Sequence, residues 1–201
     1  PDIAAAIKAD VRAGTLPQVS WVVANPAFSE HPYAPPGDGA HFVNLVYQAL
    51  AADEDVFDST VMFLNYDEND GYFDHVPPPS PPAGTAGEFL NGVPFGLGFR
   101  VPMIVISPWT RGGWVSSEVF EHTSVLRFLE TWTAALGTPA KCPNISDWRR
   151  KVSGDLTGVF DFAHPVKGAV ALPATSVIGI DNCTLLPNPV PTDNALPAQE
   201  S

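Results

Sequence analysis

The stretch that most strongly indicates the fold is STVMFLNY at 59–66, which is followed at once by DENDG at 67–71. The run is rich in apolar residues, does not alternate with charged ones, and is typical of a strand covered on both faces. Asp67 and Glu68 come directly after it, and the Asn-Asp-Gly at 69–71 favours a sharp turn. The sequence therefore predicts a buried strand that ends at a pair of carboxylates.

Further predicted elements extend this pattern in both directions along the chain. VSWVVA at 19–24 and VPMIVIS at 101–107 have the same buried-strand character. Apolar residues recur at helical spacing over 2–13, 40–52 and 123–135. Strands alternating with helices indicate an α/β fold, in which the three strands are neighbours in one mostly parallel sheet and the 40–52 and 123–135 helices pack on it.

This fold predicts where a ligand would bind. Open α/β sheets bind ligands beyond the carboxyl ends of their strands. The loops at 25–39, 67–79 and 107–114 each follow a predicted strand, so we expect them to meet at one edge of the sheet.

Five side chains in or near these loops are candidates for chemistry: Asp67, Glu68, His31, His75 and His122. Carboxylates combined with imidazoles suit a divalent metal ion. The alternative is structural: a solvated strand end, with histidines that hold loops or, at His122, cap the following helix. The spacing matches no zinc-finger, EF-hand or H-E-x-x-H pattern, so it does not decide between these interpretations.

Composition excludes several other classes. The net charge of −12 argues against binding to the phosphate backbone of nucleic acids or to anionic lipid. No apolar run reaches the 18 or more residues of a transmembrane helix. No signal peptide is visible, but the sequence begins at Pro1 rather than Met, so this says nothing about location. Cys142 and Cys183 could form one disulfide or be unrelated thiols.

Four stretches, in order and separated from one another, resemble one known family. They are LPQVSWVVANPAFSEHP at 16–32, STVMFLNYDENDGYFDHVPPP at 59–79, GLGFRVPMIVISPWTRGGWVSSEVFEHTSVLRFLE at 96–130 and DWRRKVSGDLTGVF at 147–160. The family is the bacterial phosphatidylcholine-type phospholipase C and acid phosphatase family of phosphoesterases. The resemblance covers residues 1–162 and leaves 163–201 as an irregular extension and tail.

The resemblance implies a three-layer α/β/α sandwich with a mostly parallel sheet, like that of alkaline phosphatase, and a divalent-metal site at its strand ends. It implies that Asp67 and Glu68 bind the metal and that His31 faces the substrate phosphate. His75 and His122 would line the site or support its metal ligands. The implied activity is a phospholipase C acting on a choline phospholipid; the alternatives are a broad-specificity acid phosphatase and a non-catalytic association module. The family also implies a secreted, periplasmic or cell-surface protein.

The chain also departs from the family pattern. In the family, the hydroxyl nucleophile and a Glu-Asn pair of metal ligands precede the stretch that is seen here, and this chain has no segment like it. We therefore expect residues 1–162 to be the C-terminal part of a catalytic domain with an incomplete sheet. The N-terminal segment would be its partner, either in the same polypeptide or as a separate chain, and the 201 residues alone would not turn over substrate.

Overall fold

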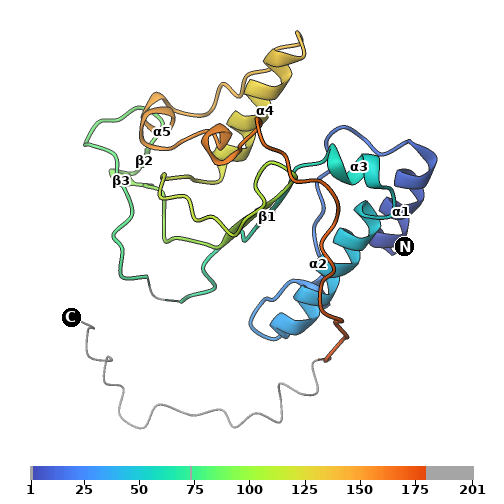
Figure 1. Ribbon diagram of the computed structural model, residues 1–201. Helices are drawn as coiled ribbons and strands as arrows, with labels where there is room; N and C mark the ends of the chain where they lie inside the picture. The colour runs from blue at the N-terminus through green and yellow to red at the C-terminus, as the bar shows by residue number, and fades with distance from the viewer. Residues whose placement is uncertain (1, 73, 180–201) are drawn as a thin grey trace, which may run out of the picture. The chain divides into compact units, whose positions relative to one another are not determined.

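The computed structural model describes residues 2–72 and 74–179, which form two compact units (Figure 1). The N-terminal unit consists of residues 2–53 and 170–179, and the central unit consists of residues 54–169. Together they contain both helices and short strands, so the chain is a mixed α and β structure, as predicted at that level. In the described ranges, no helix is both long enough and apolar enough to cross a bilayer. The predicted alternative of a disulfide involves Cys183, which lies outside the described residues.

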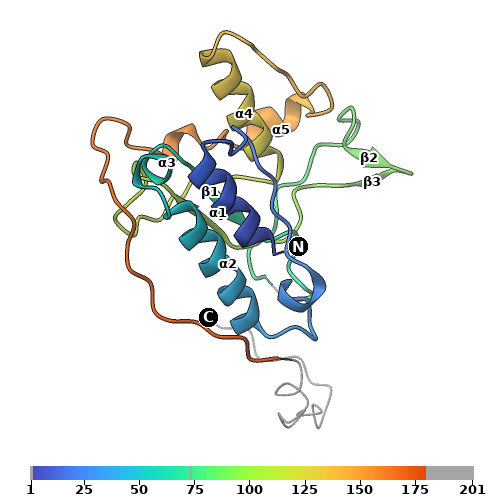
Figure 2. The same cartoon turned by 90° about the vertical axis from the view of Figure 1, so that its right-hand side faces the viewer.

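Two helices make up most of the N-terminal unit. Helix α1 (Ile3–Ala13) begins at Asp2, whose side chain accepts hydrogen bonds from the first backbone amides, and ends at Gly14 with a φ of 67°. The short 3-10 helix η1 (Pro26–Phe28) follows, and then α2 (Pro36–Leu50). Helices α1 and α2 lie side by side (Figure 2). Both predicted helices are confirmed, and α2 begins earlier than expected because Pro36 is well suited to a first helical turn.

The segment 170–179 has no helix or strand but is bonded along α2. The Tyr47 hydroxyl donates to the carbonyl of Val170 at 3.0 Å and accepts from the Val170 amide at 2.6 Å. The Asn44 amide donates to the Thr175 hydroxyl at 2.9 Å. Asp38, which is 3% exposed, accepts backbone hydrogen bonds from residues 178 and 179. A distant part of the chain therefore completes the surroundings of α2.

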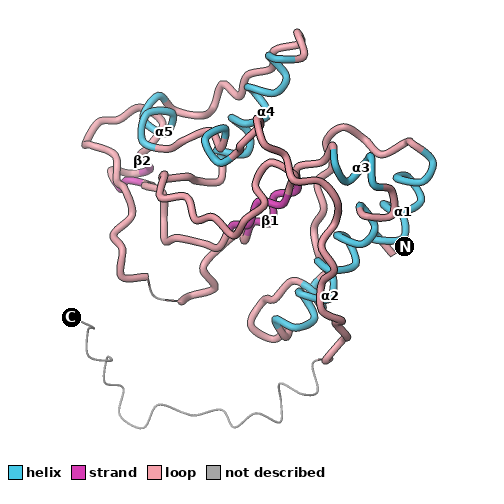
Figure 3. The backbone as a smooth tube through the Cα atoms, in the orientation of Figure 1, coloured by secondary structure: helices cyan, strands magenta, loops and turns pink. Residues whose placement is uncertain are grey.

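The central unit combines short elements with long loops, as the tube in Figure 3 makes clear. Its elements are α3 (Glu54–Asp58), β1 (Met62–Asn65), β2 (Phe89–Leu90), β3 (Val93–Pro94), β4 (Met103–Ile106), α4 (Thr123–Ala135), α5 (Asp147–Val152) and η2 (Thr157–Val159). Strands β2 and β3 form a small hairpin. Strands β1 and β4 pair with each other, with Met62 opposite Ile106 and Asn65 opposite Met103.

The pairing of β1 with β4 corrects part of the predicted sheet. The stretches at 59–66 and 101–107 do form neighbouring strands, but they run antiparallel. Parallel neighbours need a crossover connection that is usually a helix, and the described residues of 66–72 and 74–102 contain only the β2–β3 hairpin and loops. The apolar pattern carried no information on strand direction, and it overstated burial, because β1 and β4 are at most half-buried and Ile104 is 53% exposed.

The third predicted strand, at 19–24, is not a strand in the structure. Trp21 is 69% exposed and Val23 is 77% exposed. A strand exists only by pairing its backbone with another strand, and no described segment pairs with this one. The prediction of three neighbouring strands is therefore wrong for the described residues.

Aromatic side chains join α4 to the sheet in the central unit. The ring centroid of Phe63 on β1 lies 5.2 Å from that of Phe128 on α4 and 6.4 Å from that of Phe160. Phe128 and Phe160 are themselves 5.2 Å apart. These edge-on and tilted contacts are the favourable geometry for aromatic pairs. The prediction that the 123–135 helix packs against the 59–66 strand is confirmed.

An ion pair fixes α5 against α4. Arg150 donates to both oxygens of Glu130 at 2.7 and 2.8 Å and also donates to the carbonyl of Cys142 at 3.0 Å. The hydrogen bonds from Arg150 and, less strongly, the amide of Cys142 lower the pKa of Glu130 from 4.5 to about 2. The ionised carboxylate is therefore the form that stabilises this contact.

The Glu130 contact predicts a specific acid sensitivity. Because its folded pKa is depressed, Glu130 contributes stability in full above pH 4.5 and loses it as the pH falls from about 4.5 to 2. Glu130→Gln should be less stable than the wild type near pH 7, and the difference should shrink over this window. Denaturant unfolding followed by circular dichroism at several pH values measures it. The exposed Glu54→Gln is the control, and a difference that does not depend on pH would contradict the prediction.

Candidate functional site

The acid pair Asp67 and Glu68 lies at the surface of the central unit, directly beyond the end of strand β1. The strand ends at Asn65, and Asp67 and Glu68 follow in an exposed bend. The backbone amide of Glu68 donates to Oδ1 of Asp67 at 2.9 Å, which fixes one carboxylate relative to the backbone. The predicted arrangement of a strand ending at two carboxylates is confirmed.

The turn predicted after the acids is also present. Asp70 and Gly71 have positive φ values of 52° and 75°, and the amide of Tyr72 donates to the carbonyl of Asn69 at 2.9 Å. The Asn69 side chain donates back to the Tyr72 carbonyl at 2.6 Å. Asp and Gly tolerate this left-handed conformation better than most residues, so the local sequence explains why the chain reverses here.

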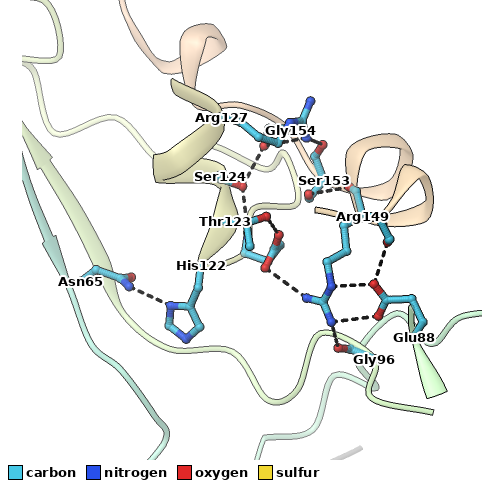
Figure 4. A network of polar contacts seen from close by, with 12 residues as sticks. Asn65, Glu88, Gly96, His122, Thr123, Ser124, Arg127, Arg149, Ser153 and Gly154 are labelled. Atoms are coloured by element: carbon cyan, nitrogen blue, oxygen red, sulfur yellow. Dashed lines mark hydrogen bonds and ion pairs between the residues drawn. The ribbon is translucent and has the colours of Figure 1, made fainter. Parts of the chain in front are cut away.

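His122 lies at the same end of β1 as the acids. Its Nδ1 atom is 3.0 Å from Nδ2 of Asn65, the last residue of the strand (Figure 4). His122 immediately precedes α4, but its side chain makes no capping hydrogen bond. Of the two roles that the sequence left open, capping the helix or pointing to the strand end, the structure shows the second.

A buried polar network holds the backbone around His122 (Figure 4). Arg149 on α5 bonds to Glu88 at 2.8 and 2.9 Å, to Glu121 at 3.2 Å and to the Gly96 carbonyl at 2.9 Å. The side chains of Glu88 and Glu121 are 2% and 5% exposed. This network therefore ties the residue before His122 to α5 and to the β2–β3 region.

The charge state of Glu88 follows from two opposing effects. Burial raises the pKa of its carboxyl group, but hydrogen bonds from Arg149 and from the Ser146 hydroxyl at 2.6 Å more than compensate, so the pKa is lowered. Glu88 is thus an ionised carboxylate inside the unit, and it depends on Arg149 for its counter-charge. Sequence reasoning missed this residue, since no motif or periodicity marks it.

His75 lies in a loop that is fixed by its neighbour. Asp74 accepts two side-chain hydrogen bonds from Arg100, at 2.7 and 2.8 Å, and one from the Arg100 backbone amide at 3.1 Å. The hydrogen bonds from Arg100 hold the pKa of Asp74 well below its usual range. Among the described contacts the Asp74 carboxylate therefore binds Arg100 rather than His75, and His75 is exposed.

His31 belongs to the N-terminal unit. It is exposed, and its ring centroid lies 4.6 Å from that of Tyr33. Its backbone amide donates to the Ser29 hydroxyl at 3.3 Å, and its carbonyl accepts from the amide of Ala34 at 2.6 Å. The loop is therefore ordered around His31, while its approach to the acid pair stays a prediction.

The loop that follows β4 does not join the acid pair as expected. Because β4 is antiparallel to β1, its last residue, Ile106, lies opposite Met62 at the beginning of β1. The loop at 107–114 therefore leaves the sheet at the end opposite to Asp67. After this loop, the chain again contacts the acid end of β1 at His122, whose ring lies next to Asn65. The expectation that three loops meet at one edge assumed parallel strands and is wrong for this loop.

The donor set for a metal is incomplete within the described chain. Asp67 and Glu68 offer the oxygen ligands that hard divalent cations prefer. However, no group of three or more His, Cys, Asp or Glu side chains in residues 2–72 and 74–179 is arranged to hold a metal ion. Protein metal sites need at least three protein ligands for zinc and six oxygens in all for magnesium or calcium. Asp67 and Glu68 are therefore suitable types of metal ligand, but two carboxylates are too few to form a complete site.

Comparison with known proteins identifies the family. The model of the phosphoesterase family matches residues 1–133. The chain belongs to the phosphoesterase family. The matched region contains all five candidate residues and confirms the resemblance that the sequence motifs indicated.

Several relatives of this phosphoesterase are named phospholipase C. A non-hemolytic phospholipase C of Burkholderia pseudomallei is 44% identical over 97% of this chain and 30% of its own length. A hemolytic phospholipase C of Pseudomonas aeruginosa is 47% identical over 85% of this chain and 24% of its own length. Phospholipase C A of Mycobacterium tuberculosis is 40% identical over 96% of this chain and 42% of its own length. The phosphoesterase chain thus spans less than half the length of these relatives.

Proposed function

We propose that this chain is the C-terminal part of the catalytic domain of a phospholipase C, which hydrolyses a choline phospholipid to diacylglycerol and phosphocholine. The observation that carries the proposal is the pair Asp67 and Glu68 at the end of β1, inside the family match, with His122 at the same strand end. The names of the relatives favour a phospholipase C over a broad-specificity phosphatase and over a non-catalytic association module.

The candidate side chains have distinct proposed roles. Asp67 and Glu68 would contribute two carboxylates to a divalent metal, whose positive charge would draw electron density from the phosphoryl oxygens. The remaining ligands and the nucleophile would come from a segment outside the 201 residues, because the donor set described here is too small. His31 would face the substrate phosphate, His122 would donate a hydrogen bond at the strand end, and His75 would line the loop beside them.

The same proposal extends to the fold and to location. Residues 1–162 would belong to a three-layer α/β/α sandwich with a mostly parallel sheet, and residues 163–201 would be an extension. The exposed apolar run at 19–24 supports this arrangement, since it is suited to join a larger sheet. We also propose that the protein is secreted, periplasmic or on the cell surface, as the family resemblance implies.

The test of this function is a complementation experiment. In a chimera, residues 1–162 replace the matching stretch of the Burkholderia pseudomallei relative, which supplies the rest of the domain. We expect metal-dependent hydrolysis of a chromogenic phosphocholine ester by the chimera. The 201-residue chain alone should match buffer with metal, because the two carboxylates bring no attacking group.

The controls separate the competing functions. The unmodified relative defines full activity, and a chelator defines the metal-free rate. Faster hydrolysis of a chromogenic phosphate monoester than of the phosphocholine ester would favour the phosphatase. Turnover by the purified 201-residue chain would show that its own residues include the nucleophile, which contradicts the proposed division of the site.

A further inference from the structure

The contact between Asn65 and His122 defines the hydrogen-bonding state of the histidine. Nδ2 of Asn65 lies 3.0 Å from Nδ1 of His122. An amide nitrogen carries two hydrogens and has no acceptor capacity, whereas a neutral imidazole has one donor and one acceptor nitrogen. With Nδ2 of Asn65 facing the ring, Nδ1 accepts and the single ring proton is on Nε2.

Both partners of this contact are held by their surroundings. Asn65 ends β1 and is registered opposite Met103 of β4. On the other side, the amide of Glu121 donates to the Ser124 hydroxyl at 3.0 Å, and the amide of Ser124 donates to the Glu121 carbonyl at 2.8 Å. Ser124 is fully buried and bonds to the Gly154 carbonyl at 2.7 Å. The exposed His122 ring is thus attached to a backbone that packing has fixed.

A second histidine of the same unit has the opposite environment. Nδ1 of His164 lies 2.9 Å from a carboxylate oxygen of Asp161. A carboxylate only accepts hydrogen bonds, so it favours a proton on Nδ1. The chain therefore contains two exposed imidazoles whose neighbours select opposite tautomers, and each serves as the reference for the other.

The tautomer decides what His122 can offer to a ligand. With the proton on Nε2, the free side of the ring is an N–H donor; with the proton on Nδ1, it is a lone pair. Phosphoryl oxygens are acceptors and need donors. We propose that Asn65 is a positioning residue that keeps the proton of His122 on Nε2, so that the ring donates to a phosphoryl oxygen at the end of β1. The identity of the ligand in this inference rests on the proposed phosphoesterase function. The tautomer of His122, however, is a property of the chain without ligand.

The tautomer can be read directly by nitrogen NMR. The chain is labelled with ¹⁵N-histidine, the His122 signals are assigned with His122→Gln, and spectra are recorded well above the usual histidine pKa of about 6.5. We expect His122 to be protonated at Nε2 and His164 at Nδ1 in the same spectrum. Asn65→Asp, which has nearly the same shape, should move the His122 proton to Nδ1 and leave His164 unchanged. Asn65→Ala should shift the tautomer ratio by about two- to tenfold, the effect of one hydrogen bond.

Two results would overturn the inference: protonation of His122 at Nδ1 in the wild type, or a His122 signal that Asn65→Asp does not change. The backbone amide spectrum shows whether each variant keeps its fold. Hydrolysis is measured separately in the chimera. A chimera without activity would count against the proposed function, while the tautomer in the ligand-free chain would still confirm or refute the role of Asn65.

Discussion

Replacing Asp67 with Asn is expected to lower hydrolysis of a chromogenic phosphocholine ester by the chimera more than about 100-fold, beyond the loss typical of residues that only support metal ligands. The substitution removes the charge while keeping the shape of the side chain. Oδ1 of Asp67 accepts from the amide of Glu68, and the oxygen of Asn can accept the same bond. The turn should therefore remain, and the lost rate should report the lost metal ligand.

The same turn offers a matched control. Asp70 is also an acid, three residues further on, and has a φ of 52°. Asn tolerates this conformation as well as Asp does, so Asp70→Asn should keep hydrolysis within about twofold, as expected for an acid that does not bind the metal. The metal content of each variant is measured together with its rate of hydrolysis. Near-full activity of Asp67→Asn with unchanged metal content would refute the assignment of the acid pair.

The second large effect concerns stability. Arg149→Ala is expected to lower the free energy of unfolding of the central unit by about 3–5 kcal/mol. The variant leaves the carboxylate of Glu88, whose residue is 1% exposed, without its bidentate partner. An unpaired buried charge is far more costly than the pair is favourable. Denaturant unfolding followed by tryptophan fluorescence measures the loss.

Two further variants separate charge from packing. Arg149→Met with Glu88→Gln and Glu121→Gln removes all three charges of the network and should recover most of the lost stability, since no ion stays buried alone. Arg100→Ala breaks another bidentate pair, with Asp74, but Arg100 is 62% exposed, so its effect should be much smaller. If Arg149→Ala and Arg100→Ala lower the free energy of unfolding by the same amount, burial does not determine the cost of losing the ion pair, and the prediction is wrong.

The sequence predicted those features that depend on neighbouring residues. The strand at β1, the turn through Asp70 and the helices α1 and α4 follow from local patterns of apolar residues, capping groups and turn formers. The carboxylate pair was found for the same reason, since it directly follows β1.

The missed features join residues that are far apart in the chain. Asn65 and His122 are 57 positions apart, and Glu88 and Arg149 are 61 positions apart. Polar pairs of this kind leave no periodic signal, so one sequence does not reveal them. The direction of β4 was missed for a related reason: it depends on the path of the chain between the strands, which apolar patterns do not encode.

The bonding of residues 170–179 along α2 has a consequence for synthesis on the ribosome. Tyr47 and its partner Val170 are separated by 123 positions. At about 5–20 residues per second, roughly 6–25 s pass between the translation of one and of the other. The whole central unit is synthesised during this interval, while α2 stays without the contacts that residues 170–179 provide. The order of translation therefore makes α2 wait for its final contacts until the chain beyond the central unit has been made.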